Sequence, residues 1–179
     1  IPYNAHHVGM KSMQHYFPVV SDNKKIALFL PIAHILGLAD IISALGSGCY
    51  VYVIQREAIA TNLLKVVMLI QPHRMMIIPM VLTKIISTGN ICILDQWCKY
   101  MKYCVTGGAA LPDQVVQKMK DVKFPLTLAY GTTETSLVSL SSPAKYKIGS
   151  CGKKIKDVKV CTAPNGEILV KGENVMLGY

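Results

Sequence analysis

Short apolar runs of strand-type residues alternate with segments of helical spacing along most of this chain, and this alternation constrains its fold more than any other feature. The expected strands are residues 25–30, 49–55, 75–78, 103–106 and 126–130. The expected helices are residues 38–45, 59–70, 79–86 and 113–120. Strands separated by helices are typical of a parallel sheet with flanking helices, so the sequence predicts an α/β fold.

The pattern changes after about residue 140, where strand-type runs follow one another without a helix between them. The expected strands in this part are residues 148–152, 159–162 and 167–171. The sequence APNG at residues 163–166 predicts a hairpin turn, because proline presets φ and Asn-Gly accepts a positive φ. We therefore expect an α/β subdomain over residues 1–140 and an antiparallel β module, resembling part of a barrel, over residues 141–179.

Charged residues make up only 16% of the chain, against about 25% in typical soluble domains. This low fraction predicts that something else covers part of the surface, as it would if the chain were a piece of a larger protein. The most apolar window, residues 26–45, contains Pro31, His34 and Asp40, and a mid-helix aspartate alone costs about 2.5 to 3.5 kcal/mol in a membrane. We therefore expect no transmembrane segment and no secretion signal.

The six cysteines form no C-x-x-C pair and no closely spaced set with histidine, so we expect reduced thiols in a cytosolic protein rather than a zinc site. The net charge of +9 is spread along the chain and is densest in the lysines between residues 145 and 159. Only Tyr146 lies among these lysines, whereas nucleic-acid binding favours interleaved aromatic side chains. We expect no nucleic-acid partner: the patch is either a solvated strand surface or a surface that attracts an anionic phosphate ligand.

Two loops follow expected strands at the edge of the sheet where parallel α/β proteins bind ligands. The first, TGGAALP at residues 106–112, has four consecutive small residues against which a flat ring could lie. The second, YGTTET at residues 130–135, combines an aromatic face and a glycine with hydroxyls, which suit phosphate oxygens, and a carboxylate, which suits Mg²⁺. The second loop is also compatible with a helix start, with Thr132 or Thr133 as the cap and Glu134 in the first turn.

Four motifs occur in one order along the chain: LPIAH at residues 30–34, TGGAALP at 106–112, YGTTET at 130–135 and GEILVKGENVMLGY at 166–179. In this order they resemble the adenylate-forming acyl-CoA synthetase family, which includes the luciferases and the adenylation domains of peptide synthetases. Residues 73–85 and 149–160 resemble the family's support for the carboxylic acid substrate and the entry to its small β-barrel. The resemblance covers essentially the whole chain, which corresponds to the middle third of the family's length.

The resemblance implies an ATP-dependent carboxylate–CoA ligase. A carboxylate attacks the α-phosphate of ATP, giving an acyl-adenylate and pyrophosphate, and coenzyme A then takes the acyl group as a thioester. The small molecules implied are a carboxylic acid, ATP or AMP, Mg²⁺ and coenzyme A. Residues 166–179 look most like long-chain fatty acyl-CoA synthetases, whereas the short interval between residues 85 and 106 looks more like o-succinylbenzoate-CoA ligases. A non-catalytic nucleotide-binding or interaction module of the same fold is the alternative.

Roles for single residues follow from the same resemblance. Thr133 would hold the α-phosphate and Glu134 would ligate Mg²⁺, which makes these two the implied catalytic residues. Gly131 would border the acyl carboxylate, and His34 would lie between the acyl and pantetheine channels, with a core histidine as the alternative. The implied nucleotide-binding residues are Gly108, Ala109, Ala110, Ala129, Tyr130, Gly131, Thr132 and Thr133, with the ring of Tyr130 stacked on adenine. The nine methionines are expected to fill the core, although Met75, Met76 and Met80 near an acyl channel would suit a flexible hydrophobic ligand.

Parts of the family's machinery are expected outside these residues. A phosphate-binding loop should precede Ile1, and His6 or His7 resembles the histidine that follows it. The aspartate that holds the ribose, the hinge and the C-terminal domain with its catalytic lysine should follow Tyr179. The missing N- and C-terminal parts are thus implied partners of this piece, which is expected to be inactive alone. The implied location is cytoplasmic, with peripheral attachment to a membrane as the alternative.

Overall fold

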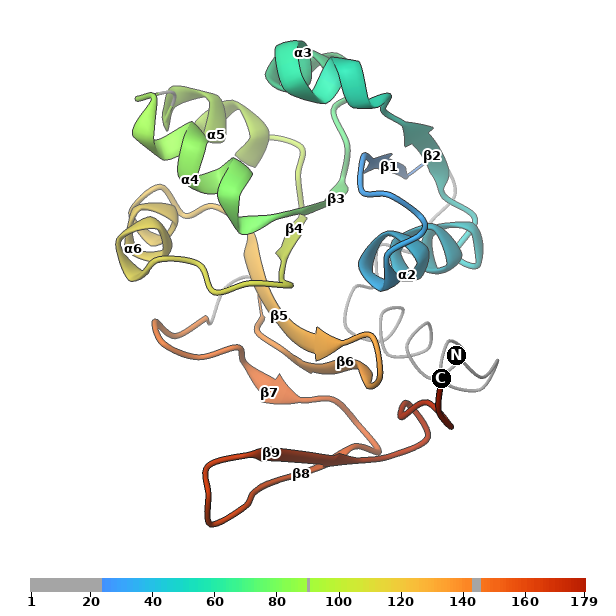
Figure 1. The fold of residues 1–179 in the computed structure, drawn as a ribbon. Coiled ribbons are helices and arrows are strands. Elements are labelled where there is room, and N and C mark those ends of the chain that lie inside the picture. Colours follow the sequence, from blue (N-terminus) through green and yellow to red (C-terminus); the bar gives the residue numbers. More distant parts are fainter. Residues whose placement is uncertain (1–23, 90, 143–145) are drawn as a thin grey trace.

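The computed structural model describes residues 24–89, 91–142 and 146–179. The helices are α2 (Ile35–Leu45), α3 (Arg56–Ile70), α4 (Pro79–Ser87), α5 (Ile91–Cys98) and α6 (Asp113–Asp121). The strands are β1 (Lys25–Leu28), β2 (Tyr50–Val53), β3 (Arg74–Ile77), β4 (Tyr103–Thr106), β5 (Leu126–Thr132), β6 (Ser136–Leu140), β7 (Lys153–Lys154), β8 (Lys159–Thr162) and β9 (Ile168–Lys171). Figure 1 shows the helices around the upper part of the sheet and β7 to β9 below it.

A seven-stranded sheet in the order β2-β1-β3-β4-β5-β6-β7 forms the centre of the molecule. Strands β1 to β5 pair in parallel, whereas β6 pairs antiparallel with β5 and β7 antiparallel with β6. Strands β8 and β9 form a separate antiparallel hairpin. The predicted fold class, a parallel sheet with flanking helices followed by an antiparallel β module, is therefore confirmed.

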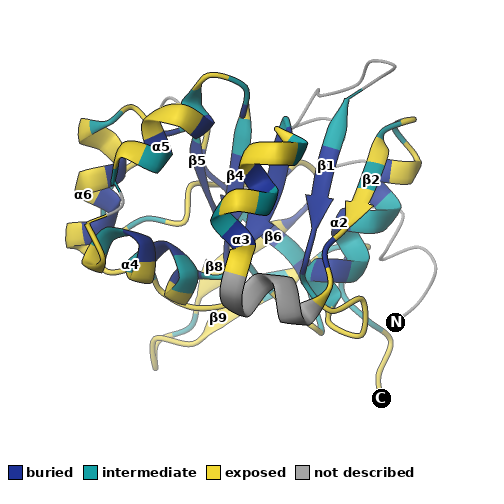
Figure 2. Cartoon of the chain, turned by 90° about the horizontal axis from the view of Figure 1, so that it is seen from above, coloured by how far each residue is buried: buried dark blue, intermediate teal, exposed yellow. Residues whose placement is uncertain are grey.

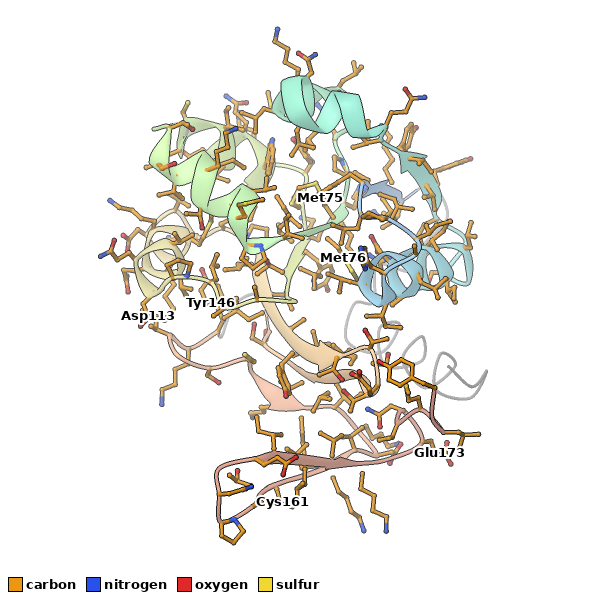
Figure 3. The ribbon with its side chains drawn as sticks, viewed as in Figure 1. Met75, Met76, Asp113, Tyr146, Cys161 and Glu173 are labelled. Carbon is orange, nitrogen blue, oxygen red and sulfur yellow. The ribbon has the colours of Figure 1, made fainter. Side chains whose placement is uncertain are left out.

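Both faces of the parallel sheet are covered, and neighbouring residues of β3 show the division (Figure 3). Met75 packs in the larger core, where α3, α4, α5 and α6 contribute Val67, Leu82, Trp97 and Met119. Met76 faces the other way and packs in the smaller core, with residues of β4, β6 and the β7–β8 segment. Figure 2 shows the buried strands behind these helices, whose exposed residues face outward. Double-sided burial explains why the central strands β1 and β3 are mostly continuous apolar runs, whereas the edge strand β2 is largely exposed.

Most expected elements lie where the sequence placed them, but residues 148–152 do not form the expected strand. Ile148 and Gly149 lie in a turn, and the strand that pairs with β6 is Lys153–Lys154. The physical reason is that Gly149 and Gly152 have φ values of +72° and +89°, which an extended strand does not accommodate. Two elements were not predicted: helix α5, and strand β6 with its alternating burial. Among the described residues, no helix is both long enough and apolar enough to cross a membrane.

A buried ion pair attaches helix α2 to the sheet. The guanidinium of Arg74 on β3 donates to Asp40 Oδ1 at 2.7 Å, to the Asp40 carbonyl at 3.2 Å and to Ser43 Oγ at 3.0 Å. Asp40 and Arg74 are only 0% and 2% exposed. Burial raises the pKa of Asp40, while the Arg74 charge and hydrogen bond act in the opposite direction. Each charge is thus tolerated in the interior mainly because the other is present.

We expect Arg74→Met to lower the free energy of unfolding by about 3 to 5 kcal/mol, because it leaves the Asp40 carboxylate buried without its partner. The double variant Arg74→Met/Asp40→Leu should recover most of that loss. Exposed Lys99 offers a matched control, since Lys99→Met should change stability by no more than about 0.5 kcal/mol. Urea denaturation measures all three, and a loss for Arg74→Met no larger than for Lys99→Met would show that the pair does not hold α2.

Candidate functional site

A pocket that is partly open to solvent lies at the carboxyl ends of the parallel strands. Helix α2 supplies an apolar wall, β3 and β4 supply one apolar residue each, and β5, β6 and the loop after β4 supply the rest. Its lining residues are Ile35, Leu36, Ala39, Met76, Val105, Gly107, Gly108, Ala129, Tyr130, Gly131, Thr132, Ser136 and Leu137. This edge is where parallel α/β sheets place their ligands, so the pocket is the candidate functional site.

Close main-chain packing between β5 and β6 shapes the mouth of this pocket. The ladder shifts register between Tyr130 and Gly131, which forms a bulge. A Cβ at Gly131 would collide with the carbonyl oxygen of Ser136, so only glycine fits the position. Ser136 itself has a φ of +52°, which tightens the chain reversal on the opposite strand. The hydroxyl-bearing residues of YGTTET are therefore presented on a tight hairpin.

The turn that joins β5 to β6 is held by two threonines. The amide of Thr132 donates to Thr135 Oγ1 and the amide of Thr135 donates to Thr132 Oγ1, both at 3.2 Å. Their two hydroxyl oxygens lie 3.1 Å apart. The interpretation of this segment as a helix start is wrong, because residues 133–135 form a turn between antiparallel strands. Threonine satisfies main-chain amides in a turn as well as at a helix cap, which is why the sequence alone left both open.

Glu134 lies in this turn, and both its side-chain carboxylate and its main-chain carbonyl accept hydrogen bonds. Its Oε1 accepts from the hydroxyl of Tyr179 at 2.6 Å, and its carbonyl accepts from the amide of Met176 at 2.7 Å. Hydrogen bonds from Tyr179 and then Thr132 lower the pKa of Glu134, so its carboxylate is ionised near neutral pH. An ionised carboxylate is the form that binds a hard cation.

At this turn the protein offers few side chains that could bind a metal ion. Among the described residues there is no group of three or more histidine, cysteine, aspartate or glutamate side chains that could hold a metal ion. Mg²⁺ in nucleotide sites usually has one or two protein carboxylates, with phosphate oxygens and water as its other ligands. A single ionised carboxylate at Glu134 therefore fits Mg²⁺ that arrives with a nucleotide.

The structure brings together about half of the predicted site residues. Those that line the pocket are Gly108, Ala129, Tyr130, Gly131 and Thr132. Those outside its lining are His34, Ala109, Ala110, Thr133 and Glu134, of which all but Glu134 are exposed. His34 precedes α2 as its N-cap and is followed by the pocket residue Ile35. The interpretation of His34 as a core histidine is wrong, whereas its proposed substrate role stays a prediction.

His6 and His7 lie outside the described residues. Met76 lines the pocket as expected for the acyl side, but Met75 is buried on the opposite face and Met80 is 71% exposed. The sequence reading missed the pocket residues Ile35, Leu36, Ala39, Val105, Ser136 and Leu137. Helical spacing predicted a helix only over residues 38–45, from Leu38, Ile41, Ile42 and Leu45, so it gave no sign that Ile35, Leu36 and Ala39 of α2 face a cavity.

An α/β sheet with a pocket at the carboxyl edge of its parallel strands is typical of a ligand-binding domain. The sequence model of the family described as "AMP-binding enzyme" matches residues 3–179. The chain therefore belongs to the AMP-binding enzyme family, as its motifs predicted.

The 2-succinylbenzoate–CoA ligase of Bacillus pumilus is 32% identical over 162 residues, covering 84% of this chain and 32% of that protein. The ligase of the same name from Bacillus velezensis is 31% identical over 173 residues, covering 89% and 34%. A solved structure of the Bacillus subtilis o-succinylbenzoate coenzyme A synthetase with ATP and magnesium ion matches 99% of this chain and 38% of its own, with a TM-score of 0.82 and 23% identity. The chain thus spans about a third of the length of the curated relatives it matches.

We expect Gly131→Ala to destabilise the β5–β6 hairpin by about 1 to 3 kcal/mol, the usual cost of an overpacked position, because the new methyl group meets the Ser136 carbonyl. Gly108→Ala is the matched control: Gly108 has a φ of +82° but no atom near the added Cβ, so this variant isolates backbone strain of about 1 kcal/mol. Thermal unfolding and amide exchange of residues 129–140 measure both variants. Equal, small effects from the two substitutions would contradict the close approach described at Gly131.

Proposed function

We propose that this chain is the central part of an ATP-dependent carboxylate–CoA ligase that forms an acyl-adenylate and then an acyl-CoA thioester. The observation that carries the proposal is the pocket itself, because it joins residues of the TGGAALP and YGTTET motifs to an apolar wall. Membership of the AMP-binding enzyme family and the names of the curated relatives support the same activity. No observation favours the alternative of a non-catalytic module.

The nucleotide would lie against the β4 loop and β5. Gly108 and Ala129 leave room for a flat ring, and the ring of Tyr130, which lines the pocket, would stack on adenine. Thr132 and Thr133 would donate their hydroxyls to phosphate oxygens at the mouth of the pocket. Glu134 would bind Mg²⁺, which supplies charge neutralisation on the phosphates. The carboxylate of Glu134 lies in the same turn as these hydroxyls, so one rigid hairpin serves the whole phosphate end.

The acyl group would lie along α2, with Gly131 beside its carboxylate. Leu36 and Ala39 of α2 face this space together with Met76 of β3, and the lining residues that the structure describes include no charged side chain. An apolar wall suits a hydrocarbon or aromatic acyl group and offers nothing to a second carboxylate. We therefore propose a monocarboxylic acid with an apolar body, accessible from the side on which His34 is exposed.

The remaining parts of the proposal concern the longer protein. The phosphate-binding loop, the ribose-binding aspartate and the C-terminal domain with its catalytic lysine would lie outside these 179 residues. Residues 1–140 and 141–179 would be partial subdomains of the family's large domain, and coenzyme A would be bound by the complete enzyme. A cytoplasmic location stays a prediction.

In the intact protein we expect Glu134→Gln to lower the rate of adenylation by about 10²-fold or more, the cost typical of removing one preorganised electrostatic group. Carboxylate-dependent exchange of pyrophosphate into ATP measures this step. Glu167 in the β8–β9 turn is an exposed glutamate remote from the pocket residues, so Glu167→Gln is the matched control and should exchange normally. Near-normal exchange by Glu134→Gln at saturating Mg²⁺ and ATP would remove this turn from the reaction.

A further inference from the structure

The last eight residues, Gly172–Tyr179, form a strap that crosses the tip of the β5–β6 hairpin. The chain leaves β9 at Lys171 and returns toward that tip, where it ends (Figure 1). The contacts of this C-terminal strap join residues that lie 37 to 45 positions apart in the sequence. The function proposed for the pocket makes no use of the strap.

Asn174 is the buried anchor of the strap, with a side chain that is 0% exposed. Its Nδ2 donates to the carbonyl of Thr135 at 2.6 Å and to the carbonyl of Leu137 at 3.1 Å. These two carbonyls flank Ser136, the residue with positive φ that reverses the chain. A carboxamide nitrogen carries two hydrogens and can bridge two carbonyls, which a carboxylate or an alkyl group cannot do.

Two further contacts of the strap reach Glu134. The amide of Met176 donates to its carbonyl, and the hydroxyl of Tyr179 donates to its carboxylate. The strap thus holds the carboxylate end and the main chain of the same residue, while Asn174 holds the other end of the turn. Within the turn itself, the hydrogen bonds of Thr132 and Thr135 are mostly exposed to solvent, and exposed hydrogen bonds of this kind add little stability.

We propose that Asn174 and Tyr179 are positioning residues that hold the β5–β6 turn in the geometry needed for nucleotide and Mg²⁺. The inference rests on the proposed function for the identity of the ligand. That the strap holds the turn is a separate, structural claim that does not depend on the ligand. Neither residue lines the pocket. Their loss therefore changes the site only through the position of the turn, and a strap that merely ties β8 and β9 to the sheet would affect overall stability without a local effect.

The test compares Asn174→Asp and Tyr179→Phe in the intact protein with two matched controls. Asn174→Asp keeps the shape of the side chain, removes both donors and places a charge against two carbonyls. Tyr179→Phe removes one hydroxyl from a fully exposed residue and so keeps the proposal testable if the buried variant does not fold. Asn165→Asp preserves the oxygen that accepts from the Glu167 amide, and Tyr50→Phe alters an exposed ring on the far edge strand β2.

The first readout is amide hydrogen exchange without ligand. We expect exchange in residues 129–140 to be about tenfold faster in Asn174→Asp, together with a lower melting temperature because a charge is buried. In Tyr179→Phe, exchange in residues 129–140 should be measurably faster, with other peptides and the melting temperature close to those of the controls. The second readout is the dissociation constant for ATP with Mg²⁺ and with EDTA. With Mg²⁺, the dissociation constant for ATP should rise in both variants. With EDTA, the dissociation constant of Tyr179→Phe should equal that of the wild-type protein.

Three outcomes would overturn the inference. The first is unchanged exchange in residues 129–140. The second is acceleration in Tyr179→Phe that is spread evenly over the protein with a matching fall in melting temperature. The third is unchanged ATP affinity in variants whose turn has loosened. A wild-type protein that binds no ATP would contradict the proposed function and with it the nucleotide half of the inference. The exchange result would still decide whether the strap holds the turn, so the two failures are distinguishable.

Discussion

The site depends on the change of direction at β5, which pairs in parallel with β4 on one side and antiparallel with β6 on the other. A parallel neighbour requires a crossover that carries the chain away from the carboxyl edge, whereas an antiparallel neighbour returns through a tight turn at that edge. The switch therefore leaves a rigid hairpin tip beside the pocket. Gly131 makes the reversal possible because its missing side chain lets β6 approach. Without this contact, hydroxyls and carboxylate would not share one turn.

The opposite wall of the pocket depends on the buried pair of Arg74 and Asp40. Helix α2 carries Leu36 and Ala39 to the pocket, and Asp40 and Ser43 on the same helix bind the guanidinium at the start of β3. A buried ion pair gives little net stability but strongly disfavours alternatives in which either charge is unpaired. The pair thus fixes how α2 lies on the sheet, and the apolar wall follows from that placement. Pocket shape on one side and hairpin geometry on the other therefore have separate physical causes.

The sequence predicted what local chemistry determines. Strand Tyr103–Thr106 and the hairpin turn at residues 163–166 have the expected bounds, because β-type residues, proline and Asn-Gly restrict the main chain locally. The motif order likewise identified the family. The Glu134 turn was ambiguous because threonine caps turns and helices alike, and residues 148–152 were misplaced because two glycines adopt a positive φ. The hydrogen bonds from Asn174 could not be predicted from the sequence, because they join residues 37 and 39 positions apart that only tertiary packing brings together.

The most direct measurement of the central claim is amide hydrogen exchange of the intact protein with and without a hydrolysis-resistant acyl-adenylate analogue, in which a sulfamoyl group replaces the phosphate. With an apolar acyl chain, the account predicts that, within residues 24–179, exchange slows in three segments: the start of α2, the loop at residues 106–112 and the hairpin at residues 129–137. An analogue whose acyl group carries a second carboxylate should protect the same segments more weakly. Binding that leaves these three segments unprotected, or that protects other segments of residues 24–179 instead, would contradict the placement of the acyl-adenylate in this pocket.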